Sequence, residues 1–137
     1  MLRNYAIAYL ATALVFLGID SIWLTLTASR LYRPLLGDML VEGFNLAPAI
    51  IFYAIYVGGI VYFGIRPAFA TGSATTAALN GAVFGFIAYA TYDLTNQATL
   101  KNWPVQITIA DLCWGTVLSG TAATLGFLIT RYLIRTA

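Results

Sequence analysis

Three aspartates stand where charged side chains are rare. Asp20, Asp93 and Asp111 lie within or at the edges of long apolar stretches, whereas Asp38 and Glu42 lie in a polar segment. A carboxylate in the apolar part of a bilayer costs free energy unless it is protonated, paired or hydrogen bonded. Such residues are candidates for a functional site. The alternative is structural, with each carboxyl fixing helix packing by bonding to neighbouring Ser, Thr or Trp side chains.

The chain between Asp93 and Asp111 concentrates hydrogen-bonding groups, and we interpret it as a loop. It reads Tyr92-Asp93-Leu94-Thr95-Asn96-Gln97-Ala98-Thr99-Leu100-Lys101-Asn102-Trp103-Pro104. Trp103 stands where an interfacial aromatic anchor belongs, and Pro104 suits the first turn of a following helix. The segment is either an ordinary polar loop or a cap over a pocket. In the second interpretation it contributes Tyr92, Asn96, Lys101 and Trp103 to the site.

An Asp-x-x-Trp pattern occurs twice, at Asp20 and Trp23 and again at Asp111 and Trp114. Residues three apart lie on neighbouring faces of a helix. An indole N–H can donate to a carboxylate, and its ring can line a pocket or hold a cation. Chance is the alternative explanation of the repeat. The chain has no His and a single Cys, so we expect no metal site, no cofactor and no established catalytic motif.

The elements that carry these residues must be membrane helices. The chain has 137 residues, 61% of them hydrophobic and 9% charged, whereas a soluble domain is about 25% charged. This composition indicates an integral membrane protein and excludes nucleic-acid binding through a basic face. Four apolar stretches are long enough to span a bilayer. We therefore predict one domain over residues 1–137, an all-α antiparallel four-helix bundle with helices at about 5–28, 45–64, 75–94 and 105–129.

A further short helix is predicted in the interface between the first two spans, within residues 31–44. An irregular loop is the alternative there. Both termini of such a bundle lie on one side, together with Arg3, Arg66, Arg131 and Arg135, against Arg30, Arg33 and Lys101 on the other. The four-to-three excess favours cytoplasmic termini. The three aspartates then share the external end of the bundle.

Small residues predict how the last two helices pack. Two ridges have four-residue spacing: Ala77, Gly81, Gly85, Tyr89 and Asp93 on one helix, and Asp111, Gly115, Ser119 and Ala123 on the other. Such ridges let helix backbones approach closely in a membrane. Packed antiparallel, they bring Asp93 and Asp111 together. Because two close carboxylates cannot both ionise cheaply, one should keep its proton unless a cation such as Lys101 lies between them.

The chain resembles an uncharacterised bacterial family of small four-helix inner-membrane proteins, filed as a domain of unknown function. The resemblance covers nearly the whole chain. It rests on Tyr92-Asp93-Leu94-Thr95-Asn96, Ala98-Thr99-Leu100-Lys101, Trp103-Pro104, Asp111 and Trp114-Gly115, with Asp20 and Trp23 in the first span. It implies a bacterial inner membrane and a single four-helix unit. It carries no established activity or catalytic residue.

Three functions compete. The first is a site for a small ligand or cation, in a transporter that would need an oligomer because four helices are few for a pathway. The second is an accessory or assembly subunit of a larger membrane complex. The third is an enzyme acting on a lipid or isoprenoid, with aspartates as general acid and base. The missing His and the lack of a catalytic motif weigh against the third.

Overall fold

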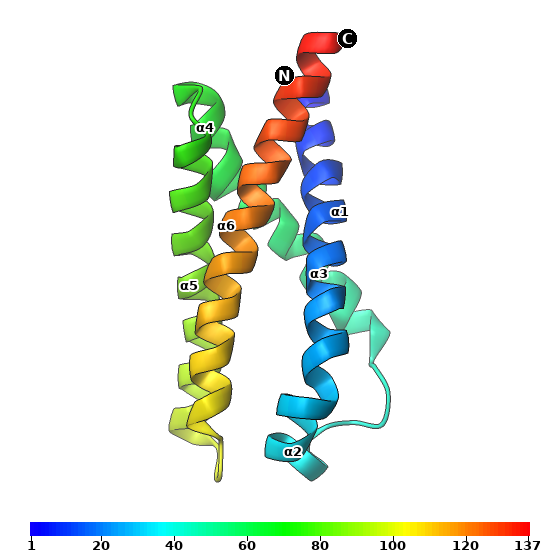
Figure 1. The fold of residues 1–137 in the computed structure, drawn as a ribbon, viewed down its shortest axis with the longest axis vertical. Coiled ribbons are helices and arrows are strands. Elements are labelled where there is room, and N and C mark those ends of the chain that lie inside the picture. The colour runs from blue at the N-terminus through cyan, green and yellow to red at the C-terminus, as the bar shows by residue number, and fades with distance from the viewer.

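The computed structural model describes all residues 1–137, and every regular element in it is helical. The long helices lie along one another, with both chain termini at one end of the bundle (Figure 1). The predicted all-α, four-helix fold is confirmed. Its elements are α1 (Leu2–Thr27), η1 (Ala28–Tyr32), α2 (Arg33–Leu36), η2 (Gly37–Met39), α3 (Leu46–Gly59), η3 (Ile60–Ile65), α4 (Arg66–Thr71), α5 (Ala74–Thr99) and α6 (Val105–Thr136).

Two wide helical turns precede proline residues and keep the helices continuous. The π-helical segments η1 and η3 each lead into an α-helical segment that begins with an Arg-Pro pair, at Pro34 and at Pro67. Proline lacks a backbone N–H, and its ring clashes with the carbonyl four residues earlier, so a locally wider turn accommodates it. Residues 66–71, which lie between the predicted spans 45–64 and 75–94, are therefore helical. The reversal itself occurs at Gly72, which has a left-handed backbone (φ 69°).

The loop expected over residues 92–104 is wrong for most of its length, because α5 continues to Thr99. Residues 92–99 are helical, and the connection to α6 shrinks to residues 100–104. Hydroxyls of Thr91, Thr95 and Thr99 each donate to a carbonyl one turn earlier, which satisfies these polar side chains within the helix. Pro104 precedes the first turn of α6 instead of lying within it, and its carbonyl accepts from the Ile107 amide at 3.1 Å.

The distribution of apolar side chains suits a membrane. The helical stretches Leu2–Met39, Leu46–Thr71 and Val105–Thr136 are long and apolar enough to cross a bilayer. Helix α5 has 26 residues but carries more polar side chains, and it packs along α6 (Figure 1). Many large apolar side chains point outward, where lipid would surround them. The core is formed by Phe16, Val57, Ile60, Ile65, Leu118 and Phe127.

Candidate functional site

The carboxyl group of Asp20 is held by two donors from other helices. Tyr53 on α3 donates its hydroxyl to Oδ2 at 2.6 Å, and Trp114 on α6 donates Nε1–H to Oδ1 at 3.1 Å. Asp20 is buried on α1. Each of its oxygens therefore has a partner, and the carboxyl links three helices.

Asp111 is held by a chain of donors from the first part of the protein. The hydroxyl of Tyr32, in the π-helical segment η1, donates to Oδ1 of Asp111. Trp23 in turn donates Nε1–H to the Tyr32 hydroxyl at 3.1 Å. The rings of Trp23 and Trp114 are stacked, with centroids 4.4 Å apart and planes 7° apart. The two Asp-x-x-Trp patterns are thus crossed, since the Trp of each serves the Asp of the other, directly or through Tyr32.

Asp93 differs from the other two aspartates. Its side chain is 0% exposed, and its carboxyl oxygens have no hydrogen-bonding neighbour besides the carboxyl group of Asp111. It adjoins Asp111 across the contact between α5 and α6. Gln97, one helical turn further along α5, also has a buried side-chain oxygen without a partner. Buried polar groups without partners are costly, so this cluster can accept hydrogen bonds or charge that the protein does not supply.

Two cavities meet at Asp111 and Tyr92. The first, of about 350 Å³, lies between α3 and α5, and its walls are mainly aromatic. The second, of about 300 Å³, lies beneath residues 24–44 and reaches Trp103. No group of three or more His, Cys, Asp or Glu side chains is arranged to hold a metal ion. The first cavity is lined by Phe52, Tyr56, Ala88, Tyr89, Tyr92 and Asp111.

Three other residues of the expected site are Trp103, Asn96 and Lys101. Trp103 donates Nε1–H to the Thr108 hydroxyl at 3.1 Å, and its ring meets that of Tyr92 edge-on with centroids 6.0 Å apart. Asn96 is half-buried, and Lys101 is exposed in the turn after α5. The hydrogen bonds that reach Asp20 and Asp111 come from Tyr and Trp side chains, not from Lys101.

The small residues lie where α5 and α6 touch. A Cβ on Gly81 would lie 2.6 Å from Cβ of Ala123 and 2.7 Å from the Ser119 carbonyl oxygen. A Cβ on Gly85 would collide with the Gly115 carbonyl and lie 2.5 Å from Oγ of Ser119. Gly115 itself lies under the ring of Tyr89, and Ala77 is fully buried. This close approach brings the Asp93 and Asp111 backbones near each other.

Sequence reasoning missed two partners of the aspartates, Tyr53 and Tyr32, and the buried side chain of Gln97 near Asp93. Tyr53 was missed because α3 is apolar on every face, so no pattern fixes its rotation. Tyr32 is 79 residues from Asp111 and reaches it only through the π-helical segment η1. Gln97 did carry a signal, since it follows Asp93 by four residues and so shares its helix face.

Comparison with known proteins identifies the family but no characterised relative. No curated protein and no solved structure matches the chain. The expected membership of an uncharacterised membrane-protein family is confirmed, because the model of the family described as "Predicted membrane protein (DUF2177)" matches residues 5–128, and the chain belongs to this family.

Proposed function

We propose that this membrane protein binds a small organic cation at the adjoining carboxyl groups of Asp93 and Asp111. The observation that carries the proposal is Asp93, which is fully buried and whose oxygens have no hydrogen-bonding neighbour besides the carboxyl group of Asp111. An ammonium group beside this pair would supply both N–H donors and a compensating charge. Asp20 is a positioning residue in this proposal, since Tyr53 and Trp114 already satisfy its oxygens.

The walls of the first cavity support an organic ligand. Phe52, Tyr56, Tyr89 and Tyr92 surround Asp111 there, and aromatic faces attract cations through their quadrupoles. A volume of about 350 Å³ is within the range of small-molecule pockets. The apolar lining favours a ligand that carries hydrocarbon as well as charge, because a fully hydrated inorganic ion gains little from such walls.

The position of Asp111 in the lining of both cavities supports a role in transport. One cavity opens between α3 and α5, and the other lies under the segment that links α1 to α3. A cation that moved from one to the other would pass beside Asp111. The excess of Arg at the end that holds both termini supports cytoplasmic termini, so that the site is at the external end. The bacterial inner membrane is the location that the family resemblance implies.

The test is equilibrium binding of a series of alkylammonium ions to the purified protein in lipid nanodiscs. We expect binding to weaken about 30-fold or more in both Asp93→Asn and Asp111→Asn, because each change removes one partner of a buried charge interaction. Asp38→Asn is the matched control, since it removes the same charge from an exposed position at the same end. Full retention of binding in both site variants would overturn the proposal.

Two results would favour the other functions. Stable co-purification with another protein, together with no alkylammonium binding, would indicate an accessory subunit. Turnover of a lipid or isoprenoid that is lost in either site variant would indicate an enzyme that uses the carboxyl pair as acid and base. Either outcome would replace the binding proposal.

A further inference from the structure

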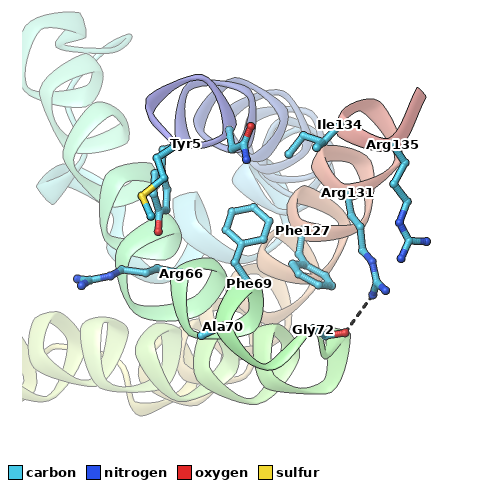
Figure 2. Close-up of a pocket in the computed structure, with 11 residues that line it drawn as sticks. Tyr5, Arg66, Phe69, Ala70, Gly72, Phe127, Arg131, Ile134 and Arg135 are labelled. Carbon is cyan, nitrogen blue, oxygen red and sulfur yellow. Dashed lines mark hydrogen bonds between the residues drawn. The ribbon is translucent and has the colours of Figure 1, made fainter. Parts of the chain in front are cut away.

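A separate hollow lies at the end of the bundle away from Asp111, beside the two chain termini. It has a volume of about 580 Å³ and is bounded by α1, α4 and α6. Figure 2 shows Phe69 and Phe127 in its centre, with Arg131 and Arg135 on one side and Arg66 on the other. This hollow shares no residue with the cavities around Asp111.

The rim of this hollow is basic and has no acidic residue. All three of its charged side chains are arginines, and none of the five acids of the chain lines it. Arg131 is fixed by donating Nη1–H to the Gly72 carbonyl at 3.0 Å, and its guanidinium lies 5.9 Å from the centre of the Phe127 ring. Arg66 lies over the ring of Tyr62 at 5.0 Å. The positive charge here is compensated by aromatic faces and one carbonyl, and not by carboxylates.

The floor of the hollow is apolar, which favours an anion that also carries hydrocarbon. Tyr5, Phe69, Phe127 and Ile134 line it beneath the arginines. A free phosphate would gain from the guanidinium groups but nothing from this floor. A phospholipid offers both parts, because its phosphate can meet the rim while its acyl chain covers apolar surface.

We infer that this hollow is a binding site for an anionic phospholipid of the leaflet that contains the chain termini. The phosphate lies beside Arg131 and Arg135, which share one side of the hollow, and an acyl chain packs on the half-buried ring of Phe69. Guanidinium groups suit this role because their N–H donors match two phosphate oxygens at once. The arginine excess at this end then serves a particular lipid contact as well as the general orientation of the chain.

The experiment measures lipid retention by native mass spectrometry after extraction from phosphatidylcholine nanodiscs that contain a minor fraction of phosphatidylglycerol. We expect the wild-type protein to retain phosphatidylglycerol selectively. Arg135→Gln should bind it about fivefold more weakly, since one basic contact is lost. Arg131 is left in place because it also holds Gly72.

The matched control is Arg3→Gln, which removes one charge from an exposed position at the same end of the bundle but outside the hollow. It should retain phosphatidylglycerol like the wild type, and helicity and melting temperature should be unchanged in both variants. Equal loss in both would show a diffuse charge effect and overturn the site. Equally tight binding of glycerophosphate and short-chain phosphatidylglycerol would show a soluble-phosphate site and overturn the lipid assignment.

Discussion

Trp23 and Trp114 are stacked face to face, with ring centroids 4.4 Å apart and planes 7° apart. This contact joins the network of Asp20 to that of Asp111, because Trp114 donates to Asp20 while Trp23 donates to Tyr32. It also joins α1 to α6, which are distant in sequence and antiparallel in space (Figure 1). The repeated Asp-x-x-Trp pattern is thus a crossed pair of contacts between the first and last helices.

Trp114→Phe tests the donor to Asp20 while keeping an aromatic ring in the stack. Loss of the indole N–H leaves Oδ1 of the buried Asp20 carboxyl without a partner. We therefore expect the free energy of unfolding to fall by about 1–3 kcal/mol. Reversible unfolding in detergent, followed by circular dichroism, measures this change. Tyr132→Phe is the control at an exposed site and should have no measurable effect. An equal loss in the two variants would refute the role of the indole donor.

Tyr32 and Asp111 should be energetically coupled. Tyr32→Phe removes the donor to Asp111 and also the acceptor of Trp23. We expect a double-mutant cycle with Tyr32→Phe and Asp111→Asn to give a coupling energy of about 1–3 kcal/mol, the range for contacting residues in one network. The same cycle between Tyr9 and Asp111 should give no coupling, because Tyr9 donates to the Ala54 carbonyl instead. Additive effects of Tyr32 and Asp111 would contradict the contact.

Gly85→Ala tests the close approach of α5 and α6. The new methyl group would collide with the Gly115 carbonyl and Oγ of Ser119, so the helices must separate. We expect a loss of about 1–3 kcal/mol in the free energy of unfolding. Gly18→Ala on α1 is the control, since a Cβ added at Gly18 would meet nothing within 4 Å. This variant should be neutral or stabilised by up to about 1 kcal/mol. Similar stability of the two variants would contradict the packing.

Asp93→Asn should stabilise the ligand-free protein. The substitution replaces a fully buried carboxyl, whose one polar neighbour is another carboxyl, by a neutral group whose amide can donate to Asp111. We expect the free energy of unfolding to rise by about 1 kcal/mol. Chemical unfolding without added ligand measures this, with Asp20→Asn as the contrasting variant that should be destabilised, since Asp20 accepts two hydrogen bonds. Destabilisation of Asp93→Asn would argue for a structural role of its carboxyl.

The hydropathy pattern was sufficient for the four helices but not for their ends. The polar run after Tyr92 looked like a loop because its Thr and Asn side chains favour turns in isolation, yet Thr95 and Thr99 bond to carbonyls of their own helix. Arg66-Pro67 lies just after the predicted end of the second span at residue 64, but the π-helical segment η3 accommodates the proline within a continuous helix.

The partners of the aspartates were harder to predict than the aspartates themselves. Spacing alone placed Asp20, Asp93 and Asp111 at one end of a bundle; in the structure Asp93 adjoins Asp111, and stacked Trp side chains link Asp111 to Asp20. Tyr53 and Tyr32 depend on the rotation of α3 and on the path of residues 28–32, and neither leaves a periodic signal in an apolar helix. Lys101, the nearest base in sequence, is exposed because the turn after α5 carries it away from the helix contact.

The most direct test of the ligand site is protection of Asp111 from a hydrophobic carbodiimide, which modifies carboxyl groups in apolar surroundings. Asp111 borders both cavities, and mass spectrometry locates and quantifies its modification. A bound alkylammonium ion should slow modification of Asp111 about tenfold or more, while exposed Asp38 reacts at an unchanged rate. Unchanged modification of Asp111 at saturating alkylammonium concentration would contradict a cation site at the Asp93–Asp111 pair.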